Sequence, residues 1–243
     1  MLFNGLFKML LTELTGIKNQ SDKSLNDLII DFIAKNYKKI GIGSFAAVFE
    51  NPKKPNEVIK FWFNDPAYEE YISFALKHPS KHFLKVYKTG KLTLNLNDGE
   101  IKLKYAKIEK LNRTEMFDEF SSGIKLSEVL YFIESVDLDI LKLPHILDLA
   151  SNEFNKNGKL PDDVSEFIIN AYSLHKALGD KHNFDLDTRN VLKRGNNFVI
   201  SDPYYSFNSV PLTDVVDRDT YWLLTKQIKQ NNTPIKSVSL SWD

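Results

Sequence analysis

The hydrophobic pattern of this chain changes its period near residue 111, and this change constrains the fold more than any other feature. Between residues 37 and 108, short runs of β-branched and aromatic residues are separated by turn residues. Between residues 126 and 178, apolar residues recur three and four positions apart. The first pattern is typical of strands and the second of helices. We therefore expect an α+β protein with a β-rich part followed by a helical part.

The β-rich part is expected to contain a three-strand meander, a short helix and a hairpin around the turn Asn97-Asp98-Gly99. These elements are predicted at residues 38–42, 46–50, 57–63, 67–77, 91–96 and 101–108. Helices are then predicted at residues 126–134, 140–154 and 164–178, with strand-like pieces at 184–193 and 198–201. Further amphipathic helices are predicted at residues 1–17, 24–35 and 219–230.

Composition excludes several classes of function. Lys and Arg together number 32, as do Asp and Glu, so the chain has no global basic field and we expect no nucleic-acid partner. Cysteine is absent, which excludes disulfides, thiolate nucleophiles and Cys-ligated zinc. No apolar run approaches the roughly 18 residues of a membrane span. We expect a cytoplasmic protein without a transmembrane segment.

A glycine-containing turn between the first two predicted strands is the first candidate site. It comprises Gly41, Ile42, Gly43, Ser44, Phe45 and Ala46 and leads to Val48. Glycines allow backbone amides to approach phosphate oxygens closely, although a hairpin that binds no ligand would have the same sequence. Ala46 stands where the kinase-type pattern has its third glycine.

The strand Val58-Ile59-Lys60 supplies a candidate cation for a phosphate group. Such a lysine needs a carboxylate to hold its ammonium group in place, and the next predicted helix offers Glu69 and Glu70. We prefer Glu69 and keep Glu70 as an alternative. A lysine that ends an apolar strand can also extend past the sheet edge into water.

Three polar residues near the C-terminal strands form the third candidate site. Asp185 and Asn190 lie five positions apart in one loop, and Asp202 follows the apolar run at residues 198–201. Asp185 can accept or orient a hydroxyl proton, whereas Asn190 and Asp202 offer oxygen ligands to Mg²⁺. Residues of these types also form ordinary turns.

The order and spacing of these motifs resemble the protein-kinase fold over residues 37–210. The resemblance implies a bilobal fold with an N-terminal helical extension (1–36), a β-rich N-lobe (37–111) and a minimal helical C-lobe (112–243). It also implies binding of ATP and Mg²⁺. By this resemblance, residues 41–48 would cover the nucleotide, and Lys60, paired with Glu69, would contact its phosphates. Asp185 would be the catalytic residue, and Asn190 and Asp202 would bind the metal. The backbone of residues 108–111, which include Glu109 and Leu111, would bind adenine.

Departures from the common motifs suggest a particular branch of this fold. Asn183-Phe184-Asp185 replaces His-Arg-Asp, and Asp202-Pro203-Tyr204 replaces Asp-Phe-Gly. Asp187 stands where Ser/Thr kinases usually have a lysine, and Arg189 is a candidate to replace its charge. The sequence is most similar to the small Ser/Thr protein kinases of short-tailed bacteriophages, and it also resembles truncated bacterial effector kinases.

The resemblance leads us to expect a Ser/Thr protein kinase that acts on a host protein in the host cytoplasm. One alternative is a catalytically weak, kinase-like binding module that captures a host protein. Another is a small-molecule phosphotransferase of the aminoglycoside-kinase type, a group that shares the Asp-x-x-x-x-Asn loop. The sequence specifies no oligomeric state.

Overall fold

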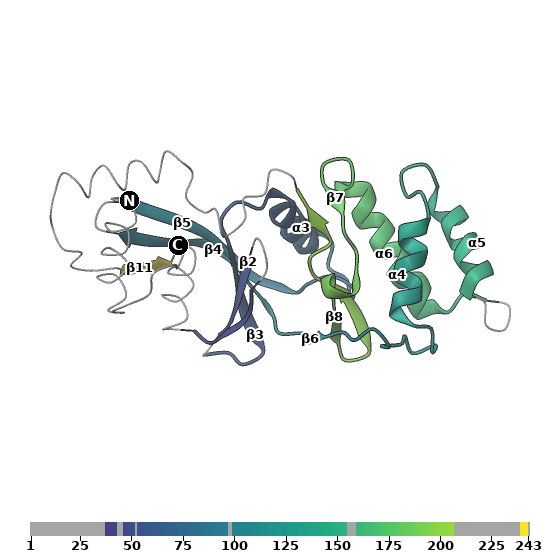
Figure 1. Cartoon of the computed structure of the whole chain (residues 1–243), viewed down its shortest axis with the longest axis horizontal. Helices are drawn as coiled ribbons and strands as arrows, with labels where there is room; N and C mark the ends of the chain where they lie inside the picture. Colours follow the sequence, from purple (N-terminus) through teal and green to yellow (C-terminus); the bar gives the residue numbers. More distant parts are fainter. Residues whose placement is uncertain are drawn as a thin grey trace, which may run out of the picture. The chain divides into compact units, whose positions relative to one another are not determined.

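The computed structural model describes most of the chain between residues 37 and 206 and a short C-terminal strand. The described residues are 37–42, 46–51, 53–96, 99–154, 159–206 and 239–242. They form a mixed structure of strands and four α-helices (Figure 1), so the predicted α+β class is confirmed. The helices predicted at residues 1–17, 24–35 and 219–230 lie outside the described residues.

The chain divides into two compact units, each assembled from separate stretches of sequence. The described residues of the first unit are those up to Asn64, Tyr87–Ile108 and the C-terminal strand. The second unit contains Asp65–Val86 and Glu109–Ser209. The helix after the third strand therefore belongs to the second unit, although the sequence places it within the expected N-lobe of residues 37–111.

The first unit is built on a six-stranded sheet with the order β1-β2-β3-β5-β4-β11. Its strands are β1 (Lys39–Ile42), β2 (Ala46–Glu50), β3 (Glu57–Trp62), β4 (Val86–Leu96), β5 (Gly99–Glu109) and β11 (Ser239–Trp242). The first three strands pair antiparallel, which confirms the predicted meander. The strands β4 and β5 begin earlier than the pattern indicates, and the Glu109 N–H donates a hydrogen bond to the Lys85 carbonyl beside the start of β4.

Aromatic side chains pack within this sheet. All six residues of β3 are buried, which explains its nearly continuous run of β-branched and aromatic residues. The ring of Phe61 lies 5.7 Å from that of Phe49 and 6.1 Å from that of Tyr105, measured between centroids. Gly90 is required by close packing, because a Cβ atom there would lie 2.8 Å from the Tyr105 hydroxyl.

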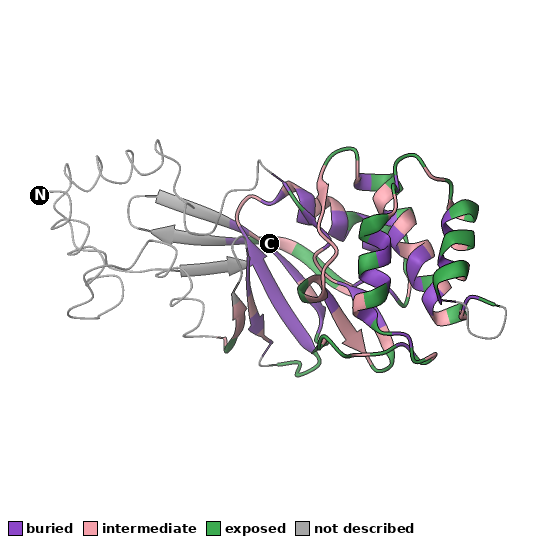
Figure 2. Ribbon diagram, turned by 45° about the vertical axis from the view of Figure 1, so that its right-hand side comes forward, coloured by how far each residue is buried: buried purple, intermediate pink, exposed green. Residues whose placement is uncertain are grey.

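The second unit contains all four described helices: α3 (Pro66–Lys77), α4 (Leu126–Ser135), α5 (Leu143–Phe154) and α6 (Asp162–Leu178). The start of α3 is defined by Asp65, whose carboxylate accepts a hydrogen bond from the Tyr68 N–H, and by Pro66 in its first turn. The buried residues of α6 recur at helical spacing along one side (Figure 2). They are Val164, Phe167, Ile168, Ala171, Leu174 and Leu178.

The helix predicted from residue 140 begins instead at Leu143. The preceding residues form a separate turn because the Asp137 carboxylate accepts hydrogen bonds from the N–H groups of Asp139 and Ile140, both at 3.0 Å. Pro144 in the first turn of α5 is compatible with a helix start at this point.

The strand-like piece predicted at residues 184–193 is interrupted in the structure. It comprises β7 (Asn183–Phe184), a 3₁₀ turn at Thr188–Asn190 and β8 (Val191–Arg194). The interruption arises because the Asp187 carboxylate accepts hydrogen bonds from the N–H groups of Arg189 and Asn190 and so caps the turn.

Two small sheets complete the second unit. In the three-stranded sheet, β8 lies between β6 (Asn112–Arg113) and β9 (Asn197–Ile200). The β8–β9 hairpin turns at Gly195, whose φ of 58° lies in the left-handed region that favours glycine. The other sheet pairs β7 with β10 (Tyr204–Tyr205).

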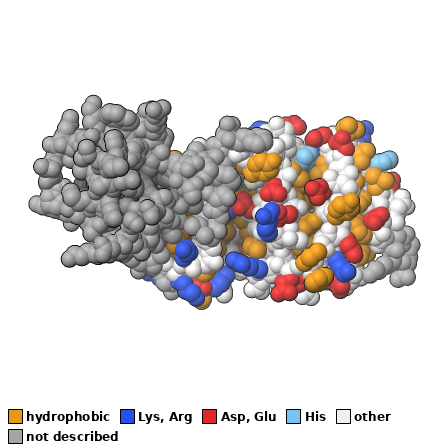
Figure 3. Space-filling model, in the orientation of Figure 1, with side chains coloured by type: hydrophobic (Ala, Val, Ile, Leu, Met, Phe, Trp, Pro, Cys, Tyr) orange, Lys and Arg blue, Asp and Glu red, His pale blue; other side chains and the backbone are white. Residues whose placement is uncertain are grey.

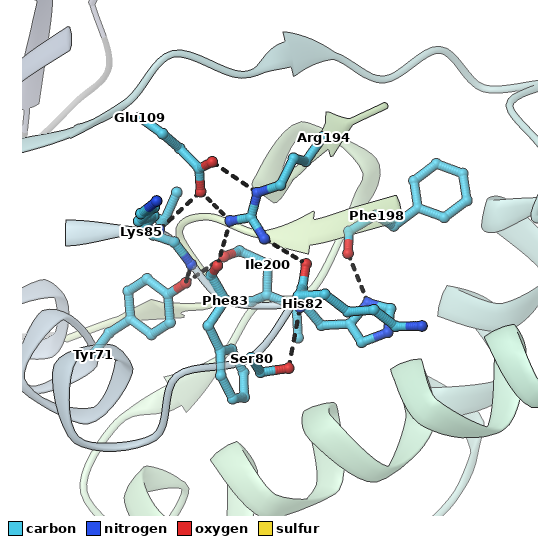
Figure 4. A network of polar contacts seen from close by, with 11 residues as sticks. Tyr71, Ser80, His82, Phe83, Lys85, Glu109, Arg194, Phe198 and Ile200 are labelled. Carbon is cyan, nitrogen blue, oxygen red and sulfur yellow. Dashed lines mark hydrogen bonds and ion pairs between the residues drawn. The ribbon is translucent and has the colours of Figure 1, made fainter. Parts of the chain in front are cut away.

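A polar network connects Arg194, at the turn of the β8–β9 hairpin, to Glu109 and to residues 81–85 (Figure 4). Arg194 donates to the Glu109 carboxylate through Nε, at 2.7 Å, and through Nη2. Its guanidinium also donates to the carbonyls of Lys81 and Phe83. The Lys85 N–H donates to the same carboxylate at 2.8 Å. These contacts hold together three stretches that are far apart in the sequence.

Candidate functional site

The loop that carries Asp185 lies beside the segment that carries Asp202. Phe184 pairs with Tyr204 in the β7–β10 ladder, and the Asp185 N–H donates a hydrogen bond of 2.7 Å to the Pro203 carbonyl. The two chain segments therefore run antiparallel through the region in which both predicted carboxylates occur.

Asn190 bridges these two segments. Its amide nitrogen donates to the backbone carbonyl of Asp185 at 2.7 Å and to the Asp185 carboxylate at 3.2 Å. Its own backbone carbonyl accepts hydrogen bonds from the N–H and the hydroxyl of Ser201, both at 2.8 Å, and a longer one of 3.4 Å from the Asp202 N–H. The second unit thus brings Asp185, Asn190 and Asp202 together.

The donor types in this cluster fit Mg²⁺. The Asn190 side chain bonds to Asp185 through its amide nitrogen. Its second terminal atom is the amide oxygen, which can act as a metal ligand. That oxygen and the Asp202 carboxylate are hard ligands, which Mg²⁺ combines with water and substrate phosphates. Within the described residues, no group of three or more His, Cys, Asp and Glu side chains forms a metal site. A site built from these two residues would therefore need further oxygen ligands from water or a bound ligand.

The negative charge of Asp202 acts on two tyrosines of α3, Tyr68 and Tyr71. The Tyr71 hydroxyl donates to the Ile200 carbonyl and accepts a hydrogen bond of 3.3 Å from the Leu84 N–H. Burial raises the pKa of the Tyr71 phenol, and the negative charge of Asp202 raises it further. Burial likewise raises the pKa of Tyr68, with Asp202 again adding to the effect. Both phenols therefore remain protonated at neutral pH, and Tyr71 supports the strand that leads into Asp202.

Arg189 pairs with a carboxylate in its own turn. Its guanidinium donates to the Asp187 carboxylate through Nε, at 2.8 Å, and through Nη2. Partial burial of Asp187 raises its pKa, but the hydrogen bonds from Arg189 and from the N–H of Asn190 outweigh this effect and hold the pKa below its ordinary value. The two side chains form a local ion pair, so the charge of Arg189 is already matched by that of Asp187.

Glu70 of α3 contacts the segment that leads into the Asp185 loop. Glu70 accepts a hydrogen bond of 3.0 Å from the Lys181 ammonium, and its other carboxylate oxygen lies 3.7 Å from Nε2 of His182. Lys181 and His182 immediately precede the β7 strand and the Asp185 loop. Glu70 thus connects α3 to that loop within the second unit.

In the first unit, Lys60 is aligned with residues of the predicted nucleotide cover. Gly41 pairs with Val48 across the β1–β2 ladder, and Val48 pairs with Lys60 across the β2–β3 ladder. Residues aligned across neighbouring strands present their side chains on the same face of a sheet. Lys60 therefore lies on the sheet face used by Val48, and it is buried there at 7% relative exposure. Ala46 begins β2, while Gly43, Ser44 and Phe45 lie outside the described residues.

In the predicted adenine-binding stretch, the Glu109 side chain has a structural role that the sequence does not indicate. The Glu109 carboxylate is occupied by Arg194 and the Lys85 N–H, as described above. The Glu109 N–H donates to the Lys85 carbonyl. Any contact of Glu109 with adenine would therefore involve its backbone carbonyl, and Leu111 follows two residues later with partial exposure.

A cavity of about 400 Å³ opens beside Asp185 in the second unit. Its walls are formed by the end of α4, the turn that follows it, the C-terminal half of α6 and the loop after β7. Apolar side chains in the lining include Ile133, Val136, Leu138, Phe184 and Leu186. The acidic ones are Glu134, Asp137, Asp139, Asp185 and Asp187.

Sequence spacing gives no indication of this cavity, because its residues come from three separate stretches. His175 lines it from α6, and its Nε2 lies 2.9 Å from the Asp139 carboxylate. The ring of His175 also packs against that of Phe184, with centroids 5.2 Å apart. Only the packing of α6 against the loop and the α4–α5 turn brings these groups together.

No family model matches this chain, and no curated protein matches it either. Among the described residues, no helix is long and apolar enough to cross a bilayer.

Proposed function

We propose that this protein is an ATP- and Mg²⁺-dependent phosphotransferase with a bilobal, protein-kinase-like fold and Ser/Thr hydroxyls of a protein as its acceptors. The observation that carries the proposal is the position of Asn190, which bonds to Asp185 through its side chain and to the Ser201–Asp202 segment through its backbone. A catalytic carboxylate and two metal ligands must lie this close together for phosphoryl transfer.

The first unit adds support from its own geometry. Lys60 lies on the third strand, which is the position expected of the phosphate-binding lysine in this type of fold. Its alignment with Gly41 and Val48 suits a lysine beneath a glycine-containing phosphate cover. Because Glu70 already accepts a hydrogen bond from Lys181, the proposal keeps Glu69, the residue preferred from the sequence, as the expected partner of Lys60.

In the proposed reaction, the acceptor hydroxyl oxygen bonds to the γ-phosphorus as the bond from that phosphorus to the β–γ bridging oxygen breaks, and ADP leaves. Asp185 accepts the hydroxyl proton. Asn190 holds Asp185 in position through its amide nitrogen. Asn190 and Asp202 would hold Mg²⁺, which neutralises charge on the phosphates when bound. Lys60 would contact the α- and β-phosphates, and the Glu109 carbonyl and Leu111 would contact adenine.

The test is phosphoryl transfer from γ-labelled ATP to a generic protein acceptor with and without Mg²⁺. Lys60→Ala and Asp202→Ala should each lower the rate at least about 100-fold, because each removes charge stabilisation of the transferring group. Lys159→Ala, which removes an exposed residue paired with Asp162, serves as the matched control and should retain activity. Circular dichroism and thermal unfolding establish that the variants are folded. Undiminished transfer by both Lys60→Ala and Asp202→Ala would refute the proposal.

The acidic cavity beside Asp185 favours a second candidate, a phosphotransferase that acts on a small cationic molecule. A volume of about 400 Å³ is within the range of small-molecule sites. Parallel assays with a protein acceptor and with an aminoglycoside acceptor distinguish the two candidates. The proposal that the acceptor is a host protein rests on the resemblance to phage and effector kinases.

A further inference from the structure

The cavity beside Asp185 has a composition that bears on which hydroxyl compounds can act as acceptors. Asp185 contributes to its lining, so an acceptor that delivers a hydroxyl to this carboxylate would occupy or border the cavity. This inference rests on the proposed phosphotransferase function. It concerns the charge of the acceptor, which the protein-kinase proposal leaves open.

The charges around the cavity are strongly unbalanced. Five of its eleven lining residues are acidic and none is Lys or Arg. Arg189 neutralises Asp187 from outside the lining. His175 faces Asp139, and the Lys176 ammonium donates to the Asp139 backbone carbonyl at 2.8 Å. Even with these contacts counted, Glu134, Asp137 and Asp185 give the cavity an excess of negative charge.

Hydrogen bonds hold two of these carboxylates, Asp137 and Asp185, in place. The Asp137 carboxylate is held by hydrogen bonds from the N–H groups of Asp139 and Ile140. Asp185 is held by Asn190. The apolar residues between the carboxylates, among them Val136 and Leu186, provide surface for carbon chains. On the face shown in Figure 3, carboxylates likewise lie among apolar side chains of the second unit.

We infer that this cavity binds the positively charged part of the acceptor, so that the enzyme prefers hydroxyls flanked by ammonium or guanidinium groups. A cation near several carboxylates is attracted, whereas an anionic acceptor is repelled. The aliphatic portion of a lysine or arginine side chain, or the ring of an aminocyclitol, suits the apolar part of the lining. Basic residues in a peptide and amines on a small molecule share this chemistry.

The experiment compares acceptors that differ only in charge. One pair is a serine peptide flanked by arginines and the same peptide with glutamines in their place. The other pair is a polyamino aminocyclitol glycoside and its N-acetylated form. We expect kcat/KM with MgATP to be on the order of tenfold higher for the cationic member of at least one pair. The pair that shows the preference identifies the source of the cation, and the preference should weaken as ionic strength rises.

A cavity variant tests whether these carboxylates cause the preference. Glu134 is exposed at the end of α4, and Glu134→Gln should reduce the preference several-fold through KM for the cationic acceptor while leaving KM for ATP unchanged. Glu153→Gln on α5, outside the cavity lining, is the matched control and should leave the preference unchanged. Calorimetric binding of the same four compounds in the absence of nucleotide gives a readout independent of transfer.

The outcomes separate this inference from the proposed function. Transfer without preference between charged and neutral acceptors, or a preference unaffected by Glu134→Gln, would overturn the inference and leave the phosphotransferase intact. If the wild type transfers to none of the acceptors, the calorimetry decides the inference: tighter binding of the cationic members supports it, and equal binding overturns it.

Discussion

Arg194 and Glu109 form a two-point ion pair between the β8–β9 hairpin and the end of β5. The Glu109 side chain is only 10% exposed and that of Arg194 is 31% exposed, so the pair is largely shielded from water. The same guanidinium donates to the carbonyls of Lys81 and Phe83, and no other residue type offers donors in this planar arrangement. The pair therefore anchors the hairpin that precedes Asp202.

We predict that Arg194→Met destabilises the protein by about 2–3 kcal/mol, because it leaves the Glu109 carboxylate shielded and without its main partner. Arg194→Lys should recover only part of this loss, since one ammonium cannot replace the guanidinium at all four contacts. Urea unfolding measures both values. As a control, Lys159→Ala breaks an exposed pair and should cause a much smaller change. Equal stability of Arg194→Met and the wild type would contradict this role.

Replacement of Asn190 should affect activity far more than stability. Asn190→Ala removes two hydrogen bonds to Asp185, a loss of about 1–2 kcal/mol of folding free energy. In the proposed reaction it also removes a metal ligand, so transfer should fall at least about 100-fold. The measurements are kcat at several Mg²⁺ concentrations and urea unfolding of the same samples. Asn170→Ala is the control, because Asn170 bonds to a helix carbonyl on the exposed side of α6. An Asn190→Ala protein with wild-type kcat would exclude Asn190 from the site.

The contact between Glu70 and Lys181 should position α3, and hence Glu69, relative to the Asp185 loop. Because both side chains are partly exposed, at 38% and 60%, breaking the pair should cost less than about 1 kcal/mol of stability. We nevertheless expect Glu70→Gln to lower kcat several-fold. The charge-reversed double variant, Glu70→Lys with Lys181→Glu, should recover most of the activity of the single variants. A double variant with the product of the two single losses would indicate that the pair has no positioning role.

Buried His82 should make the protein less stable in mild acid. Its Nδ1 lies 2.8 Å from the Phe198 carbonyl, to which it donates, and the side chain is 2% exposed. Burial lowers the pKa of His82, an effect that the positive charges of Lys81 and Arg194 reinforce and that the Phe198 carbonyl and Glu166 oppose. The unfolded chain then binds the proton more readily, with a pKa of about 6.5. Stability is therefore at its maximum above about pH 6.5 and falls as the pH drops through the lowered pKa of the folded state.

Urea unfolding at pH 7.5 and pH 5.5 checks this direction. His82→Asn keeps a donor for the Phe198 carbonyl but cannot take up a proton, so the loss of stability between the two pH values should be smaller than in the wild type. His145→Asn replaces an exposed histidine and should behave like the wild type. An unchanged pH dependence in His82→Asn would assign the acid sensitivity to other groups.

Local sequence patterns determined the α+β class and most of the elements. The helices α3, α4 and α6 were predictable because their apolar residues recur with the helical period. The meander was predictable from short runs of β-branched and aromatic residues bounded by turn residues. Boundaries failed where a single carboxylate captured backbone N–H groups, as Asp137 does before α5 and Asp187 does before β8. Such capping competes with helix or strand through hydrogen bonds that hydrophobic periodicity does not report.

Tertiary structure alone decided which residues meet across long stretches of chain. The Asp185–Asn190 spacing is a local property and was visible in the sequence. By contrast, the hydrogen bond from Tyr71 to the Ile200 carbonyl joins residues 129 positions apart in the sequence. The ion pair of Arg194 with Glu109 joins residues 85 positions apart. The acidic cavity likewise exists only after α6 packs beside the Asp185 loop. Periodicity records how each element faces a core, whereas the pairing of polar groups depends on how the elements pack, and this the chain acquires only on folding.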